Sequence, residues 1–163
     1  MIRLLKSKDV DEVMRIWLES TLKAHPFISE EYWLENYKMV KDTYIPLSKT
    51  YVMEDNSRIR GFISIIDELF IGALFVEILH QGEGIGRRLI EFSQKRHKEL
   101  DLTVYKENER AVAFYKKMGF KIKNEQINED SEKAEFRMYW EMESKQEKKA
   151  EPGLAYMNIE RKI

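Results

Sequence analysis

One short glycine-rich segment limits what this chain can fold into more than any other feature of its sequence. Gly82, Gly84 and Gly86 fall within five positions, between an apolar run and a stretch with helical periodicity. Glycine adopts backbone conformations that other residues avoid and leaves its N–H groups unshielded. N–H groups that converge at the start of a helix, together with the helix dipole, form a site for an anion. The segment therefore predicts a strand, a phosphate-binding loop and a helix in succession.

Hydrophobic periodicity and turn residues predict the remaining elements. Apolar residues at helical spacing predict a helix from residue 10, which His25 and Pro26 interrupt, and a second helix from Ser29. Two more helices are expected from Ile85 and over 108–118, the latter stopped by Gly119. Strands are expected at 2–5, 50–55, 60–66, 69–78, 100–105, 120–127 and 134–142. The sequence thus predicts a mixed α/β (α+β) fold, with a domain at 1–143 followed by a charged linker and tail at 144–163.

The bulk composition excludes several classes of protein. A formal net charge of -1 gives no general attraction to nucleic acid, and the longest apolar run, 69–76, is far short of the roughly 20 residues that span a membrane. The chain has no cysteine, which excludes disulfides, thiolate metal sites and a thiol nucleophile. Its three histidines lack metal-ligand spacing, so no metal is expected. With no signal-peptide pattern at the N-terminus, we expect a cytoplasmic protein that binds neither nucleic acid nor membrane.

The glycine loop alone leaves its ligand open. A plain strand-to-helix turn needs one glycine, whereas three at alternate positions favour an anion site, for which Arg87 and Arg88 supply positive charge. A dinucleotide would require Gly-x-Gly-x-x-Gly and an acidic residue about 20 positions later. Glu107 lies at a suitable distance, but the third glycine position is Arg87 or Leu89. A nicotinamide-dependent enzyme is therefore the weaker hypothesis.

Two motifs resemble those of the GNAT N-acetyltransferases. Residues 81–86 read QGEGIG and match the signature Gln/Arg-x-x-Gly-x-Gly/Ala of that family. Residues 102–120 read LTVYKENERAVAFYKKMGF and are similar to its second signature, Asn-x-x-Ala-x-x-Phe-Tyr-x-x-x-Gly-Phe. Residues 18–33, LESTLKAHPFISEEYW, resemble small bacterial members of the YiaC type. The resemblance extends from the first strand to about Met142.

The resemblance implies a fold and a cosubstrate. The GNAT fold is a twisted mixed sheet of about seven strands flanked by about four helices, in which the strands here at 73–78 and 102–105 part to admit the pantetheine arm of acetyl-CoA. A bulge in the first of these strands frees backbone N–H groups, here near Phe75 and Val76, to polarise the thioester carbonyl. Asn108 matches the asparagine that binds the pantetheine arm, and it is equally suited to cap its helix. Tyr115 matches the tyrosine that acts as general acid toward the thiolate; the alternative is a core tyrosine on a buried helix face. The residues expected to hold the pyrophosphate are Gln81, Gly82, Glu83, Gly84, Ile85, Gly86 and Arg87.

The general base and the acceptor site are less constrained. Glu77, Asp67 and Glu68 lie on or beside the central strands, so each is a candidate to take a proton from the amine, directly or through water. The acceptor groove is expected between the first two helices and their loop, where aromatic surface suits a cationic amine. The candidate substrate-binding residues are Phe27, Tyr32, Trp33 and Phe70.

The leading hypothesis is therefore an acetyl-CoA-dependent N-acetyltransferase, a monomer or homodimer. Its acceptor is expected to be a protein lysine or N-terminus, attacked directly in a ternary complex because no cysteine is present to form an acyl-enzyme. One alternative is a small-molecule acceptor such as a polyamine, an amino acid or an aminoglycoside. Another is a non-catalytic module that binds acyl-CoA.

Overall fold

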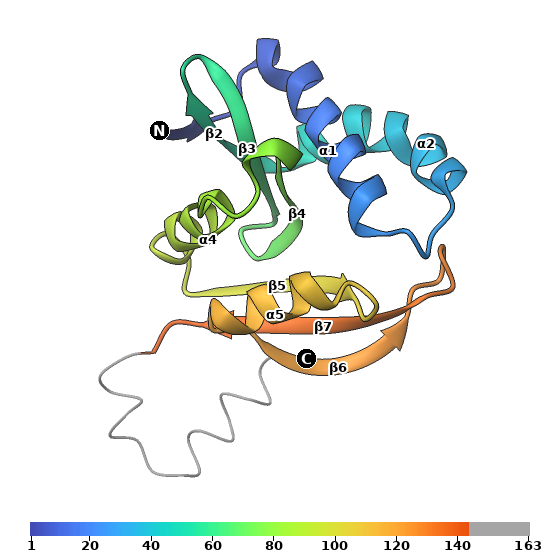
Figure 1. Cartoon of the computed structure of the whole chain (residues 1–163). Coiled ribbons are helices and arrows are strands. Elements are labelled where there is room, and N and C mark those ends of the chain that lie inside the picture. The colour runs from blue at the N-terminus through green and yellow to red at the C-terminus, as the bar shows by residue number, and fades with distance from the viewer. Residues whose placement is uncertain (144–163) are drawn as a thin grey trace.

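A single mixed β-sheet forms the centre of the molecule (Figure 1). The computed structural model describes residues 1–143, and the expected linker and tail at 144–163 lie outside the described residues. The strands run in the order β1-β2-β3-β4-β5-β7-β6, and only the β4–β5 pair is parallel. Their bounds are β1 Ile2–Leu4, β2 Lys49–Asp55, β3 Arg58–Ile66, β4 Phe70–Val76, β5 Glu99–Tyr105, β6 Lys121–Ile127 and β7 Ala134–Glu141. The seven-stranded mixed sheet expected from the sequence is confirmed.

Four helices of nine or more residues flank the sheet in this part of the chain. They are α1 Val10–Ala24, α2 Glu30–Met39, α4 Ile85–Gln94 and α5 Glu109–Lys117. Short helical turns occur at η1 Ser7–Asp9, η2 Val40–Tyr44, α3 Ile45–Leu47 and η3 Ile78–His80. None of the helices within residues 1–143 is long and apolar enough to cross a membrane.

The two faces of the sheet carry separate hydrophobic cores. In Figure 1, strands β2 to β4 lie between α4 on one side and α1 on the other, while α5 lies along β5. Helix α1 buries Val13, Met14 and Trp17 against Phe62 of β3. The other face is covered by α4 and α5, whose apolar residues pack on β2, β3, β4, β5 and β7. The buried members of this core include Leu89, Ile90, Leu102, Val112 and Met138. Burial on both faces agrees with β3, in which residues 61–65 are all buried, because a strand covered on both sides is a nearly continuous apolar run rather than an alternating one.

The hairpins end in tight turns with left-handed backbone. Asn56 and Ser57 have φ of 48° and 61° in the β2–β3 turn, and Asp67 and Glu68 have φ of 53° and 56° in the β3–β4 turn. Two consecutive residues with positive φ are typical of the turn that matches the twist of a two-stranded ribbon. Both turns lie where the sequence predicts them.

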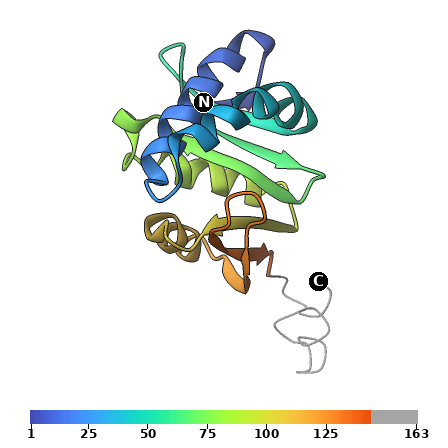
Figure 2. The same ribbon diagram turned by 90° about the vertical axis from the view of Figure 1, so that its right-hand side faces the viewer.

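Strands β4 and β5 touch at one end and then part. Their pairing consists of Phe70 opposite Asp101, and the Asp101 N–H donates to the carbonyl of Leu69 at 2.9 Å. Beyond that point, β4 continues to pair with β3, and β5 pairs with β7. Figure 2 shows the result from the side: β1–β4 with α1 and α2 form the upper half of the molecule, and β5–β7 with α5 form the lower half.

The bulge expected near Phe75 and Val76 lies earlier in β4. Ser64 of β3 pairs with Ala73 and the next residue, Ile65, pairs with Ile71, so Gly72 is the extra residue. A Cβ atom on Gly72 would approach the side chain of Ile66 to 3.2 Å, which favours glycine there. Strand β4 also ends at Val76 rather than at residue 78, because Ile78–His80 form a short helical turn.

The N-terminal strand is fixed by a buried carboxylate. Asp9 is 5% exposed. It accepts a hydrogen bond from the Lys6 N–H at 2.8 Å and forms an ion pair with Arg3 at 2.7 Å. Arg3 also reaches Glu54 of β2 at 3.0 Å. The hydrogen bond from Arg3 holds the pKa of Asp9 below its ordinary value of 3.8.

We expect Asp9→Asn to lower the free energy of unfolding at pH 7 by about 1–3 kcal/mol, the contribution of hydrogen bonds to a charged group. Because the pKa of Asp9 is lower in the folded than in the unfolded protein, its contribution is present above the unfolded pKa and is lost as pH falls. Urea unfolding should therefore show a difference between wild type and variant that shrinks below about pH 4. Asp55→Asn, at an exposed aspartate, is the control. A difference that is constant with pH would contradict this assignment.

Candidate active site

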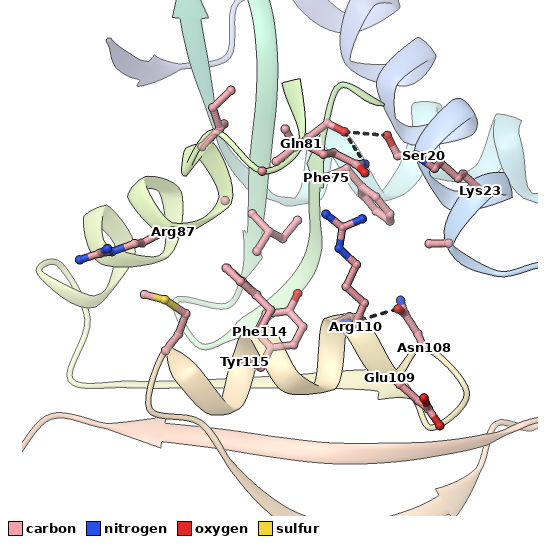
Figure 3. A pocket seen from close by; sticks show the side chains of 18 of the residues that line it. Ser20, Lys23, Phe75, Gln81, Arg87, Asn108, Glu109, Arg110, Phe114 and Tyr115 are labelled. Carbon is pink, nitrogen blue, oxygen red and sulfur yellow. Dashed lines mark hydrogen bonds between the residues drawn. The ribbon is translucent and has the colours of Figure 1, made fainter. Parts of the chain in front are cut away.

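A cavity of about 1050 Å³ opens where β4 and β5 part. Its walls come from the end of α1, from β4, from the glycine loop with the start of α4, and from α5 (Figure 3). Of the residues expected to bind the cosubstrate, these line it: Phe75, Val76, Gln81, Gly82, Gly84, Ile85, Gly86, Arg87 and Asn108. The parting of two strands thus brings segments from four elements around one space.

The free edge of β4 faces this cavity. The Glu77 N–H donates to the Arg60 carbonyl of β3 at 2.8 Å, so the alternation along a strand turns the N–H groups of Leu74 and Val76 toward the opposite edge. On that edge, the Val76 carbonyl accepts hydrogen bonds from Ser20 Oγ at 3.0 Å and from Gln81 Nε2 at 3.2 Å. The N–H that faces the gap near the expected position is therefore that of Val76, whereas the N–H of Phe75 faces β3.

The glycine loop has the conformation that its sequence predicts. Gly82 and Gly84 have φ of 84° and 81°, in the left-handed region that favours glycine, and a Cβ on either would meet open space. Gly84 is the N-cap of α4, and no side chain caps that helix. The first N–H groups of α4 are consequently left for a ligand, and Arg87 adds positive charge in the same turn.

Side chains brace the loop from outside. Arg88 donates to the carbonyls of Gly84 and Glu83, and Glu83 interacts with His80 at 3.0 Å. Glu83 does not itself line the cavity. Its side chain therefore supports the loop, and a contact between Glu83 and the cosubstrate stays a prediction.

Tyr115 points into the cavity from α5. Figure 3 shows its hydroxyl directed away from the helix, toward β4. The ring packs against Phe114 and Phe120, with centroid distances of 5.3 and 5.6 Å. Burial raises the pKa of the phenol above its ordinary value of 10.0, so it carries its proton at neutral pH. This is the protonation state that a general acid needs.

Asn108 has two contacts. Its Oδ1 accepts from the Ala111 N–H at 3.3 Å and caps α5, as the sequence suggests. Its Nδ2 lies 3.5 Å from Nε2 of His25, at the end of α1. The side chain also lines the cavity, so capping does not prevent it from contacting a ligand.

The three carboxylates considered as general base lie outside the cavity lining. Glu77 is 8% exposed and binds Arg60 at 2.8 Å and Arg15 at 2.9 Å. Burial alone would raise its pKa, but the hydrogen bonds from Arg60 and Arg15 outweigh burial and lower the pKa. A carboxylate committed to two arginines is a weak proton acceptor, so Glu77 links α1 to the sheet.

Asp67 and Glu68 lie in the β3–β4 turn, beside the closed end of the gap where Phe70 pairs with Asp101. Glu68 binds Lys49 at 3.1 Å and His97 at 3.2 Å. Neither carboxylate lines the cavity, and neither does Phe70. The β3–β4 turn therefore places Asp67 and Glu68 at the start of β4, whereas the cavity lies along the end of that strand.

The aromatic residues expected at the acceptor site divide into two groups. Phe27 lines the cavity, whereas Tyr32 and Trp33 do not. Trp33 stacks on His25 at 5.1 Å, and Tyr105 meets His25 edge-on at 5.2 Å. These aromatic rings form a packed cluster beside the cavity, with Phe27 as the member that reaches it.

Sequence reasoning missed several cavity residues. Ser20 and Lys23 come from the last turns of α1, and Arg110 rises from α5 toward Phe75 (Figure 3). A helical face that carries Ser20 and Lys23 has no signal that distinguishes it from a solvated face. Among residues 1–143, no group of three or more histidines, cysteines or carboxylates is arranged to hold a metal ion.

Comparisons with known proteins agree with this geometry. The family model of the acetyltransferase (GNAT) domain matches residues 22–140. Two peptidyl-lysine N-acetyltransferases of Escherichia coli K12 match over 122 residues: YiaC is 37% identical (75% of this chain, 84% of the relative) and YjaB is 33% identical (74% and 82%).

Solved structures show the same fold. Apo YjaB from Escherichia coli superposes with a TM-score of 0.76 at 29% identity, covering 86% of this chain and 96% of that one. The PaiA N-acetyltransferase of Thermoplasma acidophilum, solved in complex with coenzyme A, gives a TM-score of 0.71 at 22% identity, covering 87% and 98%. At that identity the second likeness concerns the fold alone.

Gly84→Ala tests whether the loop conformation makes the anion site. Alanine at positive φ costs roughly 1–2 kcal/mol, and relaxation of the loop would turn the N–H groups of α4 away from the cavity. We expect affinity for coenzyme A, measured by calorimetry, to fall roughly tenfold, which corresponds to about 1.4 kcal/mol. Gly119→Ala is the control, because Gly119 has a φ of 91° but lies outside the cavity lining. Equal losses in both variants would show a general stability effect instead.

Proposed function

Because the chain belongs to the GNAT acetyltransferase family, we propose that it transfers an acetyl group to an amine of a protein, either a lysine side chain or an N-terminus. The enzyme is an acetyl-CoA-dependent N-acetyltransferase. Its similarity to two peptidyl-lysine N-acetyltransferases supports lysine as the first acceptor to test.

The observation that carries the proposal is the cavity between β4 and β5. It has an uncapped helix with two left-handed glycines at one end and a protonated phenol in its wall. The N–H groups at the start of α4 and Arg87 suit a pyrophosphate, and the N–H of Val76 suits a carbonyl oxygen. The apolar walls from Leu74, Phe75 and Phe114 suit the pantetheine arm.

In the reaction that we propose, the amine nitrogen attacks the thioester carbonyl carbon and the carbon–sulfur bond then breaks. The departing sulfur gains a proton from the Tyr115 phenol, and the nitrogen releases one to water as the amide forms. The phenolate then recovers a proton from water. A lysine amine with an ordinary pKa near 10.4 must lose its proton before it attacks. The two arginine contacts of Glu77, and the positions of Asp67 and Glu68 outside the cavity lining, disfavour all three as the base.

Charge and composition support the remaining expectations. Acetyl-CoA and an amine acceptor are the partners that the family implies. A chain without cysteine that uses acetyl-CoA is suited to the cytoplasm, which we propose as its location. We keep a monomer or homodimer as the expected assembly, with no nucleic-acid or membrane partner.

Tyr115→Phe should separate catalysis from binding. Removing the hydroxyl removes the proton donor but keeps the ring packed against Phe114 and Phe120, so we expect the Kd for acetyl-CoA to stay within about twofold while kcat falls about a hundredfold or more. The matched control is Tyr51→Phe, which also removes a hydroxyl from a packed ring, here one that contacts Phe92 of α4. Loss of acetyl-CoA binding in Tyr115→Phe would instead assign Tyr115 a structural role.

A competition assay should identify the acceptor class. Purified enzyme with acetyl-CoA would be given a lysine-containing peptide with a blocked N-terminus, a lysine-free peptide with a free N-terminus, and a set of polyamines, amino acids and aminoglycosides. We expect mass spectrometry to find acetylation of a peptide amine and none of the small molecules. Acetylation of a small molecule alone would support the second candidate function, and turnover of none, with acetyl-CoA bound, would support a non-catalytic module.

A further inference from the structure

A buried histidine next to the cavity has no role in the reaction described so far. His25 is the residue that ends α1, it is 8% exposed, and the two residues after it, Pro26 and Phe27, line the cavity. A polar ring in such a buried position requires hydrogen-bond partners. Its two nitrogens have different partners, and these define what the ring does.

The contacts of Nδ1 fix the tautomer of His25. Nδ1 lies 2.9 Å from the carbonyl oxygen of Thr21 and 3.0 Å from Thr21 Oγ1. Because a carbonyl oxygen only accepts hydrogen bonds, Nδ1 carries the hydrogen. In the neutral ring Nε2 is then an acceptor, and burial lowers the pKa of His25, which favours the neutral ring at pH 7.

The acceptor Nε2 faces the amide of Asn108, over 3.5 Å to Nδ2. The other end of the same amide, Oδ1, accepts from the Ala111 N–H at 3.3 Å. A flipped amide would place Oδ1 against the lone pair of Nε2 and Nδ2 against the Ala111 N–H. Both contacts therefore select one orientation of Asn108, and one hydrogen of Nδ2 remains on a side chain that lines the cavity.

We propose that His25 is a positioning residue for acetyl-CoA, which holds the Asn108 amide so that its second N–H is presented to a carbonyl oxygen of the pantetheine arm. The inference rests on the proposed function, in that it takes the cavity as the acetyl-CoA site. The chain Thr21–His25–Asn108 also joins the end of α1 to the start of α5, across the gap that the ligand enters.

The side chains around His25 do not change charge between pH 5 and pH 8, so a change of charge in this cluster would come from His25 itself. The side chains in contact with it are Thr21 of α1, Phe27, Trp33 of α2, Tyr105 of β5 and Asn108. Of these only Tyr105 titrates, and burial raises its pKa above 10.0, so it stays neutral below pH 8. When His25 gains a proton, Nε2 becomes a donor and opposes Asn108 Nδ2. Because burial keeps the pKa of His25 below its ordinary value of 6.5, affinity for acetyl-CoA should fall through this proton only once the pH is below 6.5.

Two substitutions separate the functions of the ring. His25→Asn keeps a donor for the Thr21 carbonyl but removes the acceptor for Asn108, and we expect the Kd for acetyl-CoA at pH 7 to rise roughly three- to tenfold, as for one lost hydrogen bond. His25→Gln offers an amide oxygen near the position of Nε2 and does not titrate. We expect it to retain affinity within about twofold of wild type at pH 7 and to lose less affinity than wild type below pH 6.5, since the phosphate monoester of the ligand, which titrates at about pH 6, affects both proteins equally.

A double-mutant cycle tests whether His25 acts through Asn108. Acetyl-CoA affinity would be measured by calorimetry for wild type, His25→Asn, Asn108→Ala and the double variant. We expect His25→Asn to have no further effect in the Asn108→Ala background, and Asn108→Ala alone to lose less affinity than wild type below pH 6.5. The second result needs no substitution at His25, so it holds even if His25→Asn does not fold.

Additive effects in the cycle would overturn the proposal and leave His25 a packing residue. Because these measurements follow binding rather than turnover, they distinguish two failures. A wild type that does not bind acetyl-CoA would contradict the proposed function itself. A wild type that binds, with His25→Asn binding equally well, would contradict only the role of His25.

Discussion

The separation of β4 from β5 after one residue pair is the constraint on which the rest of this structure depends. Two parallel strands that paired over their full length would leave no space between them and no free N–H on either edge. Here the pairing is limited to Phe70 and Asp101, while β4 continues along β3 and β5 continues along β7 on their other edges. The cavity, the free edge of β4 and the position of α5 across the gap all follow from this separation.

An open strand edge inside a molecule is costly unless its backbone groups find partners. The structure satisfies part of the edge from outside the sheet, since Ser20 of α1 and Gln81 of the loop both donate to the Val76 carbonyl. Glu77, the next residue, is held by Arg15 of α1 and Arg60 of β3. These contacts fix the end of β4 against α1, which leaves the N–H groups of Leu74 and Val76 for a ligand.

The sequence predicts those features that local chemistry determines. Left-handed backbone at Gly82 and Gly84 follows from a requirement that few other residues meet, and the order of strands and helices follows from periodicity and turn residues. The role of Glu77 could not be predicted, because the sequence of an acidic residue at a strand end is the same whether that residue acts as a base or as an ion-pair partner. The two arginines that decide the matter are 62 and 17 positions away in the sequence.

The same limit applies to His25, whose partner Asn108 is 83 positions away. The motif around Asn108 predicts a cap and a ligand contact, but only the fold brings the end of α1 against it. The bulge was likewise expected near Phe75 and Val76 and occurs at Gly72, since the position of a bulge depends on pairing with β3 as well as on the strand's own residues.

Amide hydrogen exchange followed by NMR, with and without saturating acetyl-CoA, tests the central claim that the ligand occupies the gap between β4 and β5. The account predicts that the N–H groups of Leu74 and Val76, which face the gap, exchange rapidly in the free protein and gain protection in the complex. The N–H of Phe75, which faces β3, should be protected in both. Saturable acetyl-CoA binding that leaves Leu74 and Val76 unprotected would contradict the account, because the cosubstrate would then lie elsewhere.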